Sequence, residues 1–252
     1  YSEKGPFFGY NMLSPVWTLT YEIFFYSLFA LGLLVSQRYR KLVALCIIVL
    51  LFTGLQLMLN QRIEVSAYSD YTYPGITLID PIIAVLSSPM ILEFCFGIFL
   101  YIALVSMPDV SDRFRKIMNP FLIGLAALAL VMFFSPIFYG HGPFKWGIPA
   151  TVFLFAAMTY ERYNGLPDSR ALLYLGNISF SLYLVHVIIL KIIRKYEFDF
   201  GLTGVWAFMF AVTLSLVAAA VAYRVIEYRS IRACRQLLKN INVPTPRPLA
   251  QA

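Results

Sequence analysis

The sequence is poor in charged residues: Asp, Glu, Lys and Arg make up 13% of its 252 residues, where a soluble domain has about a quarter. Hydrophobic residues make up 60% of the chain. One soluble core could not bury so many apolar side chains, so the composition excludes a single soluble globular domain. The short alternating segments of a membrane β-barrel are also missing, because the apolar residues occur in continuous runs.

Sequence signals for metal sites and nucleotide-binding loops are missing as well. The three cysteines, Cys46, Cys95 and Cys234, are isolated, and no Cys/His spacing typical of a metal site or a disulfide framework occurs. We also find no Walker loop, no dinucleotide-binding fingerprint and no GxSxG motif. The sequence therefore predicts no bound metal and no bound cofactor.

The sequence does contain a series of apolar runs, each about 20 residues long, which is the length of a helix that crosses a bilayer. We predict an all-α fold, a polytopic transmembrane helix bundle, within a transmembrane domain at 1–228. Seven spans are predicted, at 15–36, 41–59, 78–105, 120–139, 146–160, 171–192 and 203–224. Residues 229–252 are predicted to form a basic cytoplasmic tail that lies on anionic lipid and has a disordered end.

The net charge of +7 indicates membrane topology rather than nucleic-acid binding. Most of the 20 basic residues lie in alternate predicted loops and in the tail, beginning with Arg38, Arg40 and Lys41. Cytoplasmic loops are rich in Lys and Arg, so this bias predicts a multi-pass protein of the cytoplasmic (inner) membrane with its C-terminus in the cytoplasm. The N-terminus is then outside without a signal peptide, which predicts an odd number of spans before this chain. We expect about three, although one would also satisfy the parity.

Ionisable residues inside predicted spans are the main candidates for function. A charge at the centre of a single span costs about 2.5–3.5 kcal/mol, and one hydrogen bond in a membrane returns only about 0.6 kcal/mol. Glu22 belongs to a polar helix face predicted to point into a bundle or cavity, made of Ser14, Thr18, Glu22 and Tyr26. A separate aromatic face is made of Trp17, Tyr21, Phe24 and Leu28.

The sixth predicted span carries a second polar face, made of Ser179, Tyr183 and His186. His186 and Glu22 come out at similar depth in the outer half of the membrane, so we predict that they line one polar cavity. The alternative is that each residue only joins helices through hydrogen bonds.

Glu93 is predicted to lie in the inner half of the membrane, about 21 Å from the outer surface, at the cytoplasmic entrance of a cavity. Gly97, one turn further, is a place where another helix could approach closely. A protonated structural acid is the alternative for Glu93. Asp80 is interpreted as a first-turn acid at a helix start, and His141 as a solvated loop residue.

Three segments resemble the acyltransferase 3 family of integral-membrane O-acyltransferases, namely PVWTLTYEIFFY (15–26), SPMILEFCFGIFL (88–100) and YLGNISFSLYLVH (174–186). The closing segment YRVIEYRSIR is similar to the family's final segment, except that Tyr228 replaces a Pro-like break. WGIPATVFLFAAMTYE (146–161) looks like the branch involved in exopolysaccharide production.

The resemblance implies about ten spans and the transfer of an acyl group, most often acetyl from acetyl-CoA, to a sugar hydroxyl. It implies acyl-CoA, a saccharide acceptor, the lipid bilayer and polysaccharide-assembly proteins as partners. Its implied catalytic residues are Glu22, His186 and Glu93, and its implied substrate-binding residues are Trp17, Thr18, Tyr21, Ser179 and Tyr183.

Family members typically carry a catalytic His eleven positions after a basic residue in their first span. The positions eleven residues before His141 and His186 hold Leu130 and Leu175, so this chain lacks that element and is predicted to be inactive alone. Two other hypotheses stay open, a transporter or flippase for a saccharide or lipid-linked intermediate and a structural remnant of a truncated gene. A transporter often shows repeats between its halves, and we see none.

Overall fold

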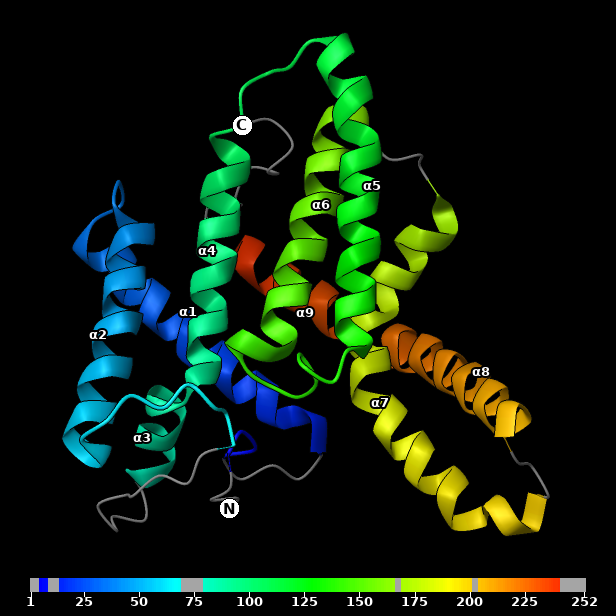
Figure 1. Cartoon of the computed structure of the whole chain (residues 1–252). Helices are drawn as coiled ribbons and strands as arrows, with labels where there is room; N and C mark the ends of the chain where they lie inside the picture. Colours follow the sequence, from blue (N-terminus) through cyan, green and yellow to red (C-terminus); the bar gives the residue numbers. More distant parts are fainter. Residues whose placement is uncertain (1–4, 9–13, 69–78, 166–168, 201–203, 241–252) are drawn as a thin grey trace. The chain divides into compact units, whose positions relative to one another are not determined.

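The computed structural model describes residues 5–8, 14–68, 79–165, 169–200 and 204–240 (Figure 1). Every regular element in these ranges is a helix, which confirms the predicted all-α class. The helices are α1 (Trp17–Val35), α2 (Arg40–Asn60), α3 (Asp80–Ser87), α4 (Leu92–Val105), α5 (Asp112–Phe134), α6 (Ile148–Asn164), α7 (Arg170–Phe200), α8 (Gly204–Ala222) and α9 (Tyr228–Asn240). Shorter turns are η1 (Ser14–Val16), η2 (Pro89–Ile91), η3 (Pro143–Gly147) and η4 (Tyr223–Glu227).

The helices that can cross a membrane are fewer than the seven predicted spans. In the described ranges, five are long and apolar enough, and six if the bent pair α3–α4 counts as one span. The predicted span at 146–160 became α6, which has 17 residues and is not among them. The preceding turn η3 does not extend α6 as one straight helix, because Lys145 within it has non-helical backbone angles (φ −106°, ψ −115°).

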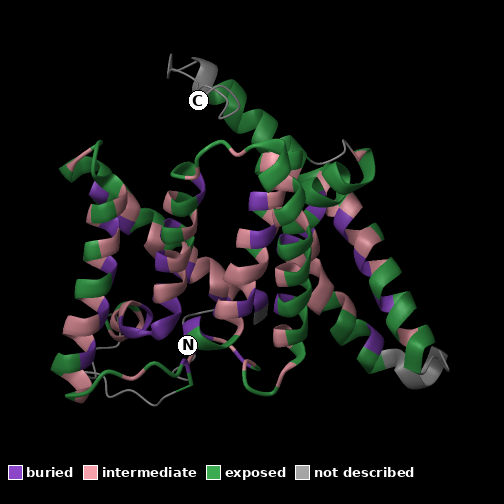
Figure 2. Ribbon diagram, turned by 45° about the horizontal axis from the view of Figure 1, so that its top comes forward, coloured by how far each residue is buried: buried purple, intermediate pink, exposed green. Residues whose placement is uncertain are grey.

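The chain divides into two compact units, unit 1 at Tyr1–Pro167 and unit 2 at Asp168–Ala252. In both, buried residues form narrow stripes along helices whose other faces are exposed (Figure 2). Large apolar side chains such as Leu34 and Phe134 are 83% and 88% exposed. Exposed apolar faces on long helices are expected where lipid replaces water as the solvent.

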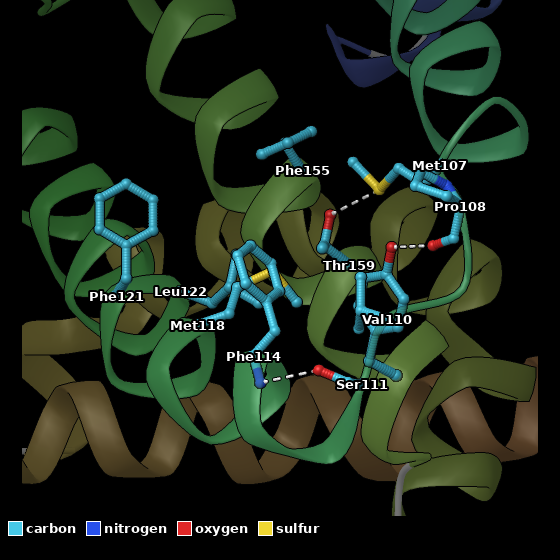
Figure 3. A pocket seen from close by; sticks show the side chains of 11 residues that line it. Met107, Pro108, Val110, Ser111, Phe114, Met118, Phe121, Leu122, Phe155 and Thr159 are labelled. Carbon is cyan, nitrogen blue, oxygen red and sulfur yellow. Dashed lines mark hydrogen bonds between the residues drawn. The ribbon is translucent and has the colours of Figure 1, made fainter.

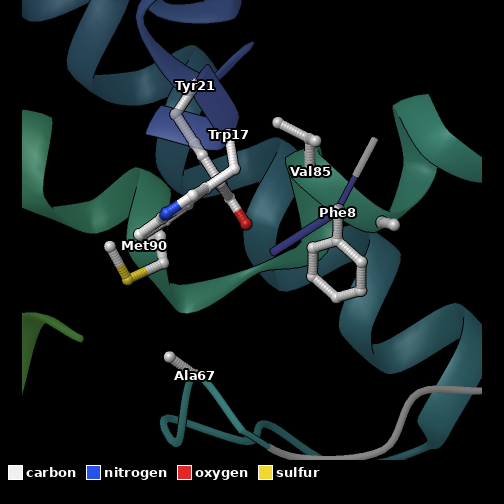
Figure 4. Packing of buried hydrophobic residues seen from close by; sticks show 7 residues of the cluster. Phe8, Trp17, Tyr21, Ala67, Val85 and Met90 are labelled. Atoms are coloured by element: carbon white, nitrogen blue, oxygen red, sulfur yellow. The ribbon is translucent and has the colours of Figure 1, made fainter. Parts of the chain in front are cut away.

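In unit 1 the aromatic face of α1, and not its polar face, packs inward. Trp17 and Tyr21 are 7% and 4% exposed, whereas Tyr26 is 62% exposed. Trp17 and Tyr21 belong to a cluster with Phe8, Ala67, Ala84, Val85 and Met90 (Figure 4). Within unit 1, the aromatic face of α1 therefore packs inward in place of the polar face, for which this position was predicted. Large rings bury more apolar area than short polar side chains.

The predicted span 78–105 is broken in its middle. α3 and the segment Pro89–Val105 are bent by 55°. Ser88 has extended backbone angles (φ −70°, ψ 135°), and its hydroxyl accepts a hydrogen bond from the Met90 backbone N–H. A residue before proline avoids the helical region, so the Ser88–Pro89 pair ends one helix and starts the next.

Gln56 of α2 fixes this break from the side. Its amide nitrogen donates to the carbonyl oxygens of Ser87 (2.7 Å) and Glu64 (3.2 Å), and its amide oxygen accepts from the Glu64 backbone N–H (2.7 Å). Gln56 itself is fully buried. One side chain thus satisfies backbone groups at the end of α3 and in the loop after α2 that have no helical partners.

We expect Gln56→Leu to destabilise the fold strongly, because it removes the hydrogen bond that the buried Ser87 carbonyl accepts and both bonds to the Glu64 backbone. A buried polar group that loses its partner costs about 1–3 kcal/mol. The measurement is thermal unfolding in detergent, with Thr53→Val as a control, since the Thr53 hydroxyl bonds only within its own helix. Equal melting temperatures for Gln56→Leu and the control would contradict this role.

Unit 2 is built on a hairpin of α7 and α8. Small residues on α8, Ala211, Ser215 and Ala219, are buried and allow the two helices to approach closely. At the end of α8, the Ser181 hydroxyl of α7 donates to the Glu227 carboxylate at 2.6 Å. The basic helix α9 follows, with the side chains of 228–237 exposed. The predicted disordered end, 241–252, lies outside the described residues.

Candidate functional site

A tight turn between α5 and α6 carries His141. Its neighbours Gly140 and Gly142 have φ angles of 113° and 127°, which only glycine adopts without strain. The backbone N–H groups of Lys145, Trp146 and Gly147 close the turn by bonding back to the carbonyls of Gly142, Gly140 and Gly142 respectively. The sequence YGHGPF therefore places one imidazole at a fixed position.

Aromatic rings surround the His141 imidazole. Its centroid lies 5.0 Å from that of Trp146, 5.1 Å from Trp17, 5.6 Å from Phe7 and 6.2 Å from Tyr68. The Tyr68 hydroxyl accepts a hydrogen bond from the His141 backbone N–H at 3.0 Å. The interpretation of His141 as a solvated loop residue is therefore wrong: the ring is half-buried.

Burial among these rings lowers the pKa of His141. The pKa of His141 in the unfolded chain is 6.5. Just below this pH, His141 binds a proton in the unfolded chain and stays neutral in the folded chain. The unfolded state then binds more protons, so stability falls as the pH drops through 6.5 toward the lowered pKa.

We therefore expect the melting temperature to decrease on acidification, and to decrease less in His141→Phe, which keeps an aromatic ring without a titrating nitrogen. Thermal unfolding at a series of pH values from neutral to mildly acidic checks this. Comparing the two slopes separates His141 from the other titrating groups, and identical slopes would contradict the assignment.

Glu93 lies against the same turn. The Gly142 backbone N–H donates a hydrogen bond to its carboxylate, and a Cβ built on Gly147 would lie 3.5 Å from Glu93 Oε1. The predicted depth of Glu93 in the membrane stays a prediction, but the residue count behind it does not fit the shape of this segment. Counting 1.5 Å per residue assumes a straight helix, and the bend at Ser88 places Glu93 in the first turn of α4, at the end of unit 1 that also holds Trp17.

Gly97, one turn after Glu93, was predicted to allow another helix to approach closely, and the structure shows no such approach in the part of the chain that it describes. Gly97 is exposed, and a Cβ added there would meet nothing within 4 Å among the described residues. No helix in the described part of the chain thus approaches closely at this position.

Glu22 is half-buried on α1, one residue after Tyr21. Its carboxylate has no hydrogen-bond or ion-pair partner among the described residues. Thr18, one turn earlier, donates to the Pro15 carbonyl at 3.2 Å. Tyr21 donates its hydroxyl to the Pro6 carbonyl at 2.9 Å, and so deeply buried a ring offers no open face for the predicted stacking on a sugar.

In unit 2, Ser179, Tyr183 and His186 line one open pocket of about 480 Å³, as their spacing predicts. Apolar residues of α7 and α8 form the other walls, with Ser215 as a further polar group. Glu22 belongs to unit 1 and His186 to unit 2, so a shared cavity for the two stays a prediction.

The orientation of His186 fixes which ring nitrogen can react. His186 Nδ1 lies 3.1 Å from the Leu182 carbonyl oxygen. A carbonyl oxygen only accepts, so Nδ1 carries the hydrogen and Nε2 of the neutral ring holds a free lone pair. The arrangement supplies a proton acceptor on a pocket wall.

Unit 1 also holds a larger pocket of about 590 Å³ between α5, α6 and the segment 107–111 (Figure 3). Its walls are mainly apolar, including Phe114, Met118 and Phe155. The Tyr163 hydroxyl at its rim donates to the Pro108 carbonyl at 2.8 Å. None of the residues predicted for the site lines this pocket, whose chemistry suits an apolar chain.

Among the described residues, no group of three or more His, Cys, Asp or Glu side chains could hold a metal ion. A family model described as an acyltransferase domain matches residues 2–224. No curated protein and no solved structure shows significant similarity to the chain.

Proposed function

The chain belongs to the acyltransferase 3 family of membrane acyltransferases, and we propose that it transfers an acyl group from acyl-CoA to a hydroxyl of a saccharide. The proposed donor is acetyl-CoA, and the proposed acceptor is a sugar of a cell-surface polysaccharide or exopolysaccharide. The observation that carries the proposal is the family match over 2–224, together with apolar helices long enough to cross a membrane.

The proposed reaction is a nucleophilic acyl substitution. The acceptor hydroxyl oxygen bonds to the thioester carbonyl carbon, the C–S bond breaks, and the hydroxyl proton passes through a base to the departing thiolate. The hydroxyl is a weak nucleophile until a base removes this proton. The developing oxyanion needs hydrogen-bond donors at fixed positions.

We assign His186 as the proton acceptor, because its Nε2 is free and lines a pocket. Tyr183 and Ser179, on the same wall, are assigned as hydrogen-bonding groups for the acyl or acceptor group. Glu22 is assigned to hold the acceptor hydroxyl or to orient a histidine. Glu93 acts as a positioning residue, since its carboxylate fixes the turn that carries His141.

We further propose a location in the cytoplasmic (inner) membrane with the C-terminus in the cytoplasm, where polysaccharide-assembly proteins are expected partners. The charge distribution of the loops supports this orientation. The proposal includes acyl-CoA as a substrate and no bound cofactor.

The test uses membranes that contain the full-length protein, radiolabelled acetyl-CoA and polysaccharide from the same cells. Label should enter the polysaccharide as an alkali-labile ester only when the protein is present. A saccharide transporter would instead move labelled sugar across the membrane without modifying it. That outcome, with no ester formed, would overturn the proposal.

A further inference from the structure

The rings next to His141 form an exposed aromatic patch. Phe7, Tyr68 and Tyr139 are 38%, 50% and 70% exposed. Tyr139 also packs edge-on against Trp146, with ring centroids 5.3 Å apart. Aromatic side chains gathered on a loop and held by a rigid turn are typical of a binding surface rather than of a core.

The imidazole inside this patch has no partner for its side chain. Among the described residues, neither ring nitrogen of His141 makes a hydrogen bond. The residue is half-buried, and neither ring nitrogen is among the fully buried polar atoms that lack a partner in the described part of the chain, so a ligand can reach the ring. A neutral imidazole offers one donor and one acceptor, which is what a ligand hydroxyl requires.

The charged groups close to the turn already have partners. The Glu93 carboxylate accepts from the Gly142 backbone N–H, and Lys145 Nζ donates to the Ile137 carbonyl at 2.9 Å. Neither partner removes the charge, but neither residue belongs to the patch. The patch itself offers ring faces, ring edges and one hydrogen-bonding imidazole without a fixed charge, which suits a neutral ligand.

We propose that His141 and the rings of Phe7, Tyr68, Tyr139 and Trp146 form a binding site for a neutral saccharide. Sugar rings present polarised C–H groups that pack on aromatic faces, and hydroxyls that bond to the imidazole. The inference rests on the proposed function, since the bound sugar is then part of the acyl acceptor.

An aromatic belt at the membrane surface is the competing explanation, because Trp and Tyr are enriched at both interfaces. A belt needs no histidine between two glycines with positive φ angles, and no imidazole left without a partner. These two features favour a ligand over an interfacial anchor.

The test uses tryptophan fluorescence of the full-length protein in detergent. Unit 2 contributes Trp206, which is 76% exposed, and Trp206→Phe leaves Trp17 and Trp146, both in contact with His141, as the chain's reporters. Titration with polysaccharide purified from the cells that carry the gene, without acyl-CoA, should give a saturable change. His141→Ala should weaken binding about 10-fold, since losing one hydrogen bond and one ring contact has an effect of this order.

Tyr139→Ala removes an exposed ring at the edge and should also weaken binding, which keeps the test valid if His141→Ala fails to fold. Phe134→Ala, an exposed aromatic residue on a helix, is the matched control and should bind normally. The inference would be overturned if the polysaccharide gave no response, or if both His141→Ala and Tyr139→Ala bound it as tightly as the unsubstituted protein does. Emission that responds to lipid vesicles alone would also overturn it. Saturable binding without any acyl transfer would overturn the proposed function and leave this site standing.

Discussion

His186→Asn is expected to lower the rate of acyl transfer by about 10²–10⁴-fold, the usual contribution of a general base. Asparagine can still donate to the Leu182 carbonyl that now accepts from Nδ1, while it lacks the Nε2 atom. The substitution therefore keeps the local helix contact and removes only the proposed proton acceptor. Transfer from radiolabelled acetyl-CoA, measured at saturating donor and acceptor, reports the change in kcat.

Ser215→Ala is the matched control in the same pocket. The proposed mechanism gives the Ser215 hydroxyl no role, so its loss should have a much smaller effect on the rate. Equal losses in both variants would indicate that the pocket responds to packing and not to base catalysis. Full activity in His186→Asn would remove His186 from the mechanism.

Glu22→Gln is expected to change stability and activity in opposite directions. A charged side chain costs about 2.5–3.5 kcal/mol at the centre of a span and less toward its ends, and no described residue pairs with this carboxylate. Neutralising it should therefore raise the free energy of unfolding by about 1 kcal/mol. Transfer should nevertheless fall by about 10²–10³-fold, the effect of removing one fixed electrostatic group from a reaction site.

Both quantities can be measured on one preparation, the first by thermal unfolding in detergent and the second by label transfer. Tyr26→Phe, one turn further along α1 and exposed, controls for a nonspecific change of that helix. A Glu22→Gln protein that is less stable and inactive would show a structural role. One that retains full activity would refute the proposed role of the carboxylate.

The spacing of residues along the sequence was sufficient to predict the helical class and the common helix face of Ser179, Tyr183 and His186 in unit 2. Residues three, four and seven apart lie on one side of any regular helix, and α7 is regular from Ser179 to His186. The pattern therefore predicts that Ser179, Tyr183 and His186 meet the same space, and all three line one pocket.

The same reasoning failed where a helix is interrupted. The depth predicted for Glu93 assumed one straight span, although Ser88 and Pro89 already signal a break. The glycines on either side of His141 were a comparable signal, since such residues hold a loop in one conformation. Neither signal tells which distant segments meet.

By itself, the sequence determined that this is an all-helical membrane protein with acyltransferase motifs, because composition, helical period and motifs can be read without knowing any contact between distant residues. The tertiary structure alone decided that Glu93, His141, Trp17 and Trp146 gather at one end of unit 1. Trp17, Glu93 and the turn that carries His141 and Trp146 come from different helices or loops, and the bend at Ser88, where Gln56 binds the Ser87 carbonyl, lets them meet. A contact between residues far apart in the chain depends on how the helices pack, which no local pattern encodes.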